Sequence, residues 1–279
     1  MLQVQIEALF DQPSAHFTEK DQRLFRKFKE ALNDGEIRAA QPDASAPSGW
    51  RVNSWVKKGI LLGFRMGAIV DMSVDASRQP FFDKSTYPVK KFTATSGVRI
   101  VPGGSSIRDG GFIGKGVVCM PPMYINVGAY VGDGTLVDSN ALIGSCAQIG
   151  RNCHISAGAQ IGGVLEPVGA LPVVIEDDVL AGGNSGVYEG TVVKRRAVLG
   201  TGTILNRSTP IYDLVTGAIH KATDNEPLVV PENAVVVAGS RAIRQGRGKE
   251  WQLSLYTPAI VKYRDEKTDQ KIKLEDLLR

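Results

Sequence analysis

Two charged side chains, Asp138 and Arg99, are the first candidates for chemistry. A carboxylate within hydrogen-bond reach of an amine can orient it and take up its proton, so Asp138 could act as a general base. A guanidinium holds a carboxylate through two parallel hydrogen bonds, so Arg99 could bind an acidic ligand. Asp138 could equally be a solvated corner or an Asx turn, and Arg99 an ordinary surface arginine. These residues alone leave both interpretations open.

The histidines and cysteines do not suggest a metal site. Three histidines are too dispersed to supply zinc ligands, and three cysteines lack any paired metal spacing. Two of the cysteines fall on core positions of the repeat described below, which predicts buried, reduced thiols. The residues are His16, His154, His220, Cys119, Cys146 and Cys153.

A six-residue repeat is the feature that must position any site. Every sixth residue from Val101 to Ile161 is apolar, and after a 14-residue step the pattern resumes at Ile175 and runs to Ile211. Chance does not explain such a run in a chain that is 43% hydrophobic. Asp138 directly follows the apolar Val137, at a position that is mostly glycine or another small residue in the other repeats. A carboxylate at that position is therefore out of pattern.

Small residues at fixed positions indicate what the repeat builds. Glycine often follows the apolar residue, as at Gly132 and Gly144, and a small residue lies four positions after it, as at Ala141 and Ala147. Period six fits neither an amphipathic helix nor a hairpin sheet, but it suits short strands joined by sharp corners around a narrow core. We therefore expect a mainly β fold containing a parallel β-helix. The longer step places eight surplus residues in a loop at 163–172, and such loops can carry function.

The flanking segments predict three parts: a helical or α/β domain over residues 1–95, the β-helix over 96–215, and a C-terminal β extension over 216–279. Thr18 to Asp21 resembles a capping box that opens a helix, and a second helix is expected from Trp55 to Met66. Val235–Val237 and Ala259–Val261 are typical of strands, and 273–279 of a short polar helix or tail.

Length and composition narrow the class of protein. The 279 residues carry a formal charge of +4, include 31 glycines and are only 7% aromatic, which suits a fold of tight corners. The mild charge would favour an anionic small molecule, and no basic run suggests a nucleic-acid surface. No apolar stretch has the length of a signal peptide or membrane span, so we expect no membrane association and a cytoplasmic location.

The repeat resembles that of the hexapeptide acyltransferases, whose left-handed β-helix uses three hexapeptides for each coil. Several stretches are more specific and resemble the tetrahydrodipicolinate N-succinyltransferase family over most of residues 50–265. These are Gly97–Pro102, Asn126–Val131, Val137–Asp138, Gly144–Gly150, Gly162–Pro167 and Val235–Ser240. The left-handed winding is implied by this resemblance and does not follow from period six.

The resemblance implies an activity and roles for particular residues. The family transfers succinyl from succinyl-CoA, a co-substrate with no permanently bound cofactor, to the amino group of L-2-amino-6-oxopimelate, the ring-opened form of tetrahydrodipicolinate, on the route to diaminopimelate and lysine. Asp138 matches the family's substrate-contacting aspartate and Arg99 its substrate-binding arginine. The family also implies a homotrimer with active sites between neighbouring subunits.

The chain departs from the family at Gly186, where members carry a glutamate that could partner the aspartate. Glu189 could replace it, although an exposed corner glutamate is the alternative interpretation. For the coenzyme phosphates the available cations are Lys194, Arg195, Arg196 and Arg207, all of which could instead be solvated. Related acyltransferases acting on sugars use a histidine base, but His154 lies in a stretch that belongs to the succinyltransferase pattern.

Two other functions remain open at this stage. One is an acyltransferase of the same fold that uses acetyl-CoA or another amine acceptor, because the coil says little about acyl length. The other is a non-catalytic scaffold of hexapeptide repeats, against which Arg99 and Asp138 argue.

Overall fold

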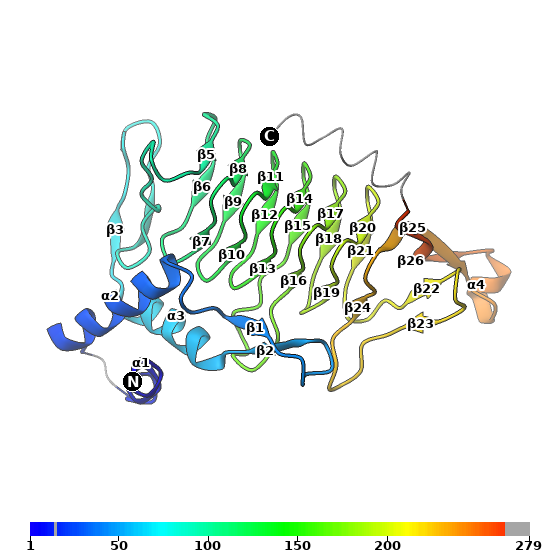
Figure 1. The fold of residues 1–279 in the computed structure, drawn as a ribbon, viewed down its shortest axis with the longest axis horizontal. Coiled ribbons are helices and arrows are strands. Elements are labelled where there is room, and N and C mark those ends of the chain that lie inside the picture. Colours follow the sequence, from blue (N-terminus) through cyan, green and yellow to red (C-terminus); the bar gives the residue numbers. More distant parts are fainter. Residues whose placement is uncertain (14–15, 266–279) are drawn as a thin grey trace.

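The body of the protein is a parallel β-helix made of three sheets, as predicted (Figure 1). The computed structural model describes residues 1–13 and 16–265. Strands one coil apart pair in register, so that Tyr130 lies beside Phe112 of the preceding coil and Gln148 of the following one. Three six-residue repeats separate each of these partners from the next, and three repeats therefore make one turn of the coil.

The strands of each sheet come from every third repeat, and each sheet is named here by its first strand. The β7 sheet holds β7 Phe112–Ile113, β10 Tyr130–Val131, β13 Gln148–Ile149, β16 Val174–Ile175, β19 Val192–Val193 and β24 Val229–Val230. The β6 sheet holds β6 Ser106–Ile107, β9 Tyr124–Ile125, β12 Leu142–Ile143, β15 Gln160–Ile161, β18 Gly186–Val187 and β21 Ile204–Leu205. The parallel part of the β5 sheet holds β5 Arg99–Ile100, β8 Val118–Cys119, β11 Leu136–Val137, β14 His154–Ile155, β17 Leu180–Ala181, β20 Val198–Leu199 and the start of β25 Ala234–Ala242.

In the coil from β8 to β21, the second residue of each two-residue strand points into the core. Ile143, Ile149 and Ile155 are fully buried, and the small residues expected at the corners, such as Ala147, are buried with them. At Gly132 an added Cβ would lie 2.6 Å from the carbonyl carbon of Gly150 in the next coil. Only glycine allows the coils to approach this closely.

The surplus loop lies where the repeat predicts it. Gln148 pairs with Val174 and Gln160 with Gly186, so both pairs across the interruption are further apart in sequence than one regular turn of three repeats. The eight extra residues leave the coil between β15 and β16. This loop lies on the side of the coil that also carries the hairpin of β1 Ala40–Pro42 and β2 Trp50–Val52 (Figure 1).

The coil ends differently from the expectation. The repeat places Ile211 in the β7 sheet, but Val229 and Val230 of β24 fill that place beside β19. The first residue of a strand in the coil donates its N–H to the next coil, as Val192 does to Leu228. Pro210 lies three repeats after Val192 and has no N–H to donate. Ile211–Asp213 instead forms β22, which pairs with β23 Ile219–His220 and with β26 Ser254–Tyr263.

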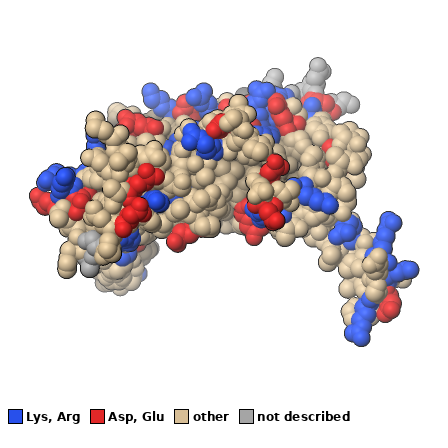
Figure 2. Space-filling model, turned by 90° about the horizontal axis from the view of Figure 1, so that it is seen from below, with Lys and Arg blue, Asp and Glu red and all other residues tan. Residues whose placement is uncertain are grey.

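The coil therefore extends past residue 215, since Val235 and Val236 of β25 also stack on β20. Both predicted C-terminal strands are confirmed within β25 and β26, which form a long antiparallel hairpin with α4 Gly246–Glu250 near its tip. The hairpin projects from the body as an arm rich in Lys and Arg at the right of Figure 2. The helix or tail expected at 273–279 lies outside the described residues, and the three-part division of the chain stays a prediction.

The N-terminal region contains α1 Leu2–Phe10, α2 Glu19–Asn33 and α3 Ser54–Met66, with two small hairpins, β1 Ala40–Pro42 with β2 Trp50–Val52 and β3 Ile69–Asp71 with β4 Phe82–Lys84. Both predicted helices are confirmed, and Thr18 and Asp21 form the reciprocal capping box that opens α2. The core of this region includes Val127 and Cys146 of the coil. The N-terminal region and the coil therefore share one apolar core.

All three cysteines are buried free thiols, as predicted. Burial raises the pKa of Cys119, Cys146 and Cys153 to about 12. Within the described part of the chain, no helix is long and apolar enough to cross a membrane.

The buried apolar column predicts a large difference between two leucines. Leu199 is fully buried, whereas Leu214 is 68% exposed. Leu199→Ala should lower the free energy of unfolding by about 3 kcal/mol, because it leaves a cavity in the coil. Leu214→Ala should cost about 0.5 kcal/mol or less. Urea unfolding followed by circular dichroism measures both, and equal losses would contradict this assignment of the core.

Candidate active site

The predicted site residues lie on three different corners of the coil. Asp138 follows β11 at the corner between the β5 and β6 sheets. Glu189 and Arg207 follow β18 and β21 at the corner between the β6 and β7 sheets. Lys194 and Arg195 follow β19 at the corner between the β7 and β5 sheets. One copy of the chain therefore does not bring these three groups together.

The side chain of Asp138 approaches that of His154, which lies one coil along and is the register partner of Leu136. His154 Nε2 is 3.7 Å from Asp138 Oδ2, and Asp138 Oδ1 accepts a 2.7 Å hydrogen bond from the Ser139 N–H. The side chain of His154 is 13% exposed and that of Asp138 29% exposed. The arrangement joins a carboxylate to an imidazole on a surface that a substrate can reach.

Arg99 shares the outer face of the same sheet. It pairs with Val118, and the same row continues through Leu136 to His154. Arg99 is exposed, and its strand lies two places from β11, about 10 Å at the usual strand spacing. Arg99 therefore lies in, and Asp138 directly follows, strands of the same sheet that are two places apart.

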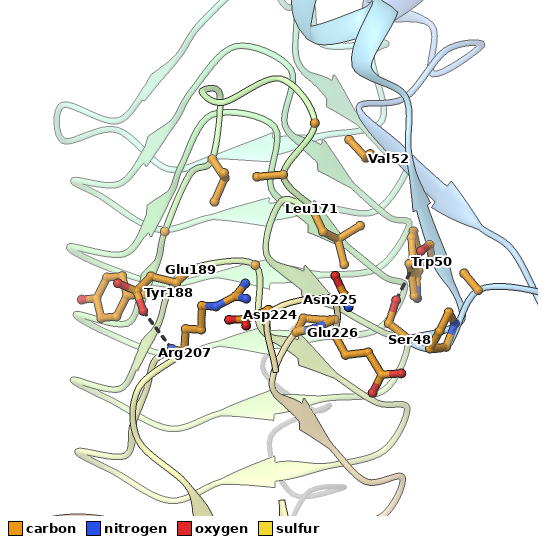
Figure 3. A pocket seen from close by; sticks show the side chains of 18 of the residues that line it. Ser48, Trp50, Val52, Leu171, Tyr188, Glu189, Arg207, Asp224, Asn225 and Glu226 are labelled. Carbon is orange, nitrogen blue, oxygen red and sulfur yellow. Dashed lines mark hydrogen bonds between the residues drawn. The ribbon is translucent and has the colours of Figure 1, made fainter. Parts of the chain in front are cut away.

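Glu189 has a structural task at its corner. Its Oε2 accepts a 2.8 Å hydrogen bond from the Arg207 N–H of the next coil (Figure 3). At other corners Glu176 likewise accepts the Arg195 N–H of the next coil, and Asp133 accepts the Lys115 N–H of the preceding coil. This shared use supports the interpretation of Glu189 as a corner residue.

A hollow of about 830 Å³ lies at the Glu189 corner. The surplus loop, the N-terminal segment around Ser48 and Trp50, and residues 224–227 enclose it together with Glu189 and Arg207 (Figure 3). Arg207 Nη2 donates to the carbonyl of Thr223, which holds the guanidinium at this hollow. Of the predicted cofactor-binding cations, Arg207 alone is among the residues that line it.

The other three cations are held by protein groups. Lys194 Nζ donates to the carbonyl of Ser48 at 2.6 Å and to Glu176 Oε1 at 2.9 Å, and Trp50 Nε1 donates to the same carboxylate oxygen at 2.8 Å. Arg195 pairs with Glu232 at 2.8 Å, and Arg196 Nε donates to Asn233 Oδ1 at 2.9 Å. Lys194 thus fastens the N-terminal segment to the coil.

Comparisons with known proteins agree on one family. A model described as the tetrahydrodipicolinate N-succinyltransferase N-terminal region matches residues 1–66, and two hexapeptide-repeat models match residues 128–163 and 172–207. A 2,3,4,5-tetrahydropyridine-2,6-dicarboxylate N-succinyltransferase of Xylella fastidiosa is 44% identical over 90% of this chain and 86% of its own length. A protein of the same name from Polynucleobacter asymbioticus is also 44% identical over the same shares.

The chain belongs to the tetrahydrodipicolinate N-succinyltransferase family.

Membership explains two parts of the chain that the repeat does not cover. The three helices fall within the region matched by the N-terminal model of the N-succinyltransferases. The two repeat models stop at residue 163 and resume at residue 172, so they bracket the surplus loop. Both parts border the large hollow.

Gly186, where the sequence predicts a departure from the family pattern, lies against Tyr188. A Cβ at Gly186 would lie 2.5 Å from Tyr188 Cε2, and one at Gly162 would lie 2.8 Å from Tyr188 Cδ1. The tyrosine ring covers both glycines, so a glutamate at position 186 would require this ring to move. The tyrosine at position 188 therefore depends on a glycine at position 186.

Sequence patterns did not predict Trp50, Ser48 and Tyr188 at the hollow. They also argued against a catalytic role for His154. A signal for His154 was available, because three repeats beyond Leu136 the chain has made one turn and His154 lies directly beside the strand that leads to Asp138. Nothing periodic connects Trp50 with the coil.

The corner interpretation of Glu189 predicts the result of removing its charge. Glu189→Gln keeps an oxygen that can accept the Arg207 N–H, so stability should change by about 1 kcal/mol or less. If Glu189 has only this task, kcat and KM should stay at wild-type values in steady-state assays. A fall in kcat of orders of magnitude would instead make Glu189 the replacement for the family glutamate.

Proposed function

We propose that the protein transfers a succinyl group from succinyl-CoA to the amino group of ring-opened tetrahydrodipicolinate, in the succinylase branch of diaminopimelate and lysine biosynthesis. Family membership supports the reaction, and the observation that carries it to this chain is the Asp138–His154 pair on the face that also bears Arg99. A cytoplasmic location is part of the proposal.

The acceptor lies across the outer face of the β5 sheet in this proposal. Arg99 holds one carboxylate of the substrate through its guanidinium. Asp138 receives a hydrogen bond from the amine and takes up its proton as the nitrogen attacks the thioester carbonyl. His154, 3.7 Å away, can help to orient Asp138 and to share that proton.

The reaction goes by direct transfer between the two bound substrates. The amine nitrogen forms a bond to the succinyl carbon, backbone N–H groups stabilise the oxyanion, and the carbon–sulfur bond breaks to release the CoA thiolate. A covalent cysteine intermediate is disfavoured, because burial holds the pKa of each thiol at about 12.

The donor binds at the hollow on the Glu189 corner. The hollow is partly polar, and Arg207 in its wall is available to the phosphates of the coenzyme. Lys194 and Arg195 are second choices for the phosphates, since each already pairs with a carboxylate. The roles of these three cations stay predictions.

Separate corners for acceptor and donor favour an assembly. Asp138 and the hollow are on different corners, and Glu189 is two coils along from Asp138. A reaction that needs both is completed when the acceptor face of one copy meets the hollow of a neighbour. A homotrimer, with one site at each contact between subunits, satisfies this requirement.

Replacing Asp138 tests the mechanism. Asp138→Asn keeps the size of the side chain but removes the proton acceptor, so kcat should fall by about 100- to 10,000-fold with the fold intact. Asp133→Asn is the matched control, because Asp133 caps a corner amide and an asparagine oxygen can do the same. Near-normal kcat for Asp138→Asn, or equal losses in both variants, would remove Asp138 from catalysis.

The assembly predicts that activity depends on association. On dilution, the succinyl transfer per chain should disappear together with the trimer, because one copy has an incomplete site. Light scattering and thiol-release assays on the same dilution series test this. An active monomer would contradict it.

A further inference from the structure

Lys57 is a buried lysine that the proposed reaction does not use. It lies in α3 among the residues of its buried face, including Val56 and Ile60, and its side chain has no exposed surface. Its Nζ donates a 2.6 Å hydrogen bond to the carbonyl of Ala170. Burial lowers the pKa of Lys57 from its ordinary value.

A buried ammonium is costly unless it donates hydrogen bonds. Among the described residues, Lys57 donates to the Ala170 carbonyl, which belongs to the surplus loop at 163–172. An apolar residue would satisfy the packing of α3 more simply. The lysine therefore contributes more to the position of the loop, through its hydrogen bond to Ala170, than to the packing of α3.

A second contact joins the same loop to the N-terminal region. Leu165 packs against the apolar cluster that contains Phe28, Ile60 and Tyr87. The loop is also fixed to the coil, since Val164 N–H donates to the Ser145 carbonyl at 3.1 Å. At the other end, a Cβ on Gly190 would lie only 2.6 Å from the carbonyl oxygen of Leu171.

The residues fixed in this way line the large hollow. Val164, Ala170 and Leu171 belong to its wall, together with Ser48 and Trp50 of the N-terminal segment. Loss of the Lys57 hydrogen bond would free the middle of the loop, where Gly169 has open space around it. The shape of the hollow would change while the core of the coil stayed intact.

We propose that Lys57 is a positioning residue for the donor site: it holds the surplus loop in the conformation that binds acyl-CoA. Through this hydrogen bond, the N-terminal region influences the affinity of the donor site for acyl-CoA. This inference rests on the proposed function, because it takes the hollow to be the site of the coenzyme.

The test compares Lys57→Met with Lys58→Met, the neighbouring lysine of α3. Lys58 is partly exposed and lies 3.6 Å from Asp11 at the surface, so it offers the same substitution without a loop contact. Lys57→Gln, whose amide can still donate, is the conservative variant. Three quantities are measured on the full-length protein: amide hydrogen exchange over residues 163–171, the Kd of CoA by calorimetry, and kcat and KM for succinyl-CoA.

For Lys57→Met we expect loop exchange and the Kd of CoA to rise by about tenfold, as for loss of a hydrogen bond to a charged donor. KM for succinyl-CoA should rise in parallel while kcat stays near the wild-type value, Lys57→Gln should recover part of the loss, and Lys58→Met should match the wild type. If Lys57→Met does not fold, Lys57→Gln is compared with the wild type by the same measurements.

Unchanged loop exchange in the Lys57 variants would overturn the proposal, and so would faster exchange with unchanged affinity for CoA. Failure of the proposed function has a different signature. In that case the wild-type protein binds CoA at the hollow but transfers no succinyl group, while the effect of Lys57 on loop exchange and CoA affinity remains measurable.

Discussion

The stacking of each coil on the next, at a fixed register of three repeats, is the constraint on which the structure depends. Each two-residue strand pairs with the strands before and after it, and its inward side chain joins a column that is closed to water. Burial of that column provides the main driving force. The close approach of successive corners restricts residues there to glycine and other small types, and the few exceptions become conspicuous.

The residues of the proposed site lie where the chain departs from this regular stacking. Asp138 occupies a corner position that is usually small and lies beside His154 of the next coil. The surplus loop adds a wall that the coil lacks, and the N-terminal region reaches it through Lys57 and Leu165. In the proposed function, the regular coil supplies the acceptor face, while the surplus loop and the N-terminal region help to enclose the donor hollow.

The repeat predicted much of the fold because each apolar position has the same neighbours in every coil. It predicted the inward residues from Ile107 to Leu205 and the eight-residue loop. It did not predict the first strand, where Ile100 instead of Val101 lies beside Cys119, or the departure at Ile211, where the apolar pattern continues and a proline interrupts the hydrogen bonds. The hand of the winding rests on the family resemblance, since period six specifies neither hand. Contacts such as Lys57 with Ala170 and Trp50 with Glu176 join residues that are far apart in the chain, with no periodic signal to connect them.

The central claim is that the protein transfers succinyl from succinyl-CoA to the amino group of ring-opened tetrahydrodipicolinate. Its most direct test is to follow free thiol released by the wild-type protein from succinyl-CoA or acetyl-CoA, with and without tetrahydrodipicolinate. The account predicts rapid release from succinyl-CoA only when tetrahydrodipicolinate is present, with much slower release from acetyl-CoA. Release that does not depend on tetrahydrodipicolinate, that is as fast with acetyl-CoA, or that never exceeds the rate without protein would contradict it.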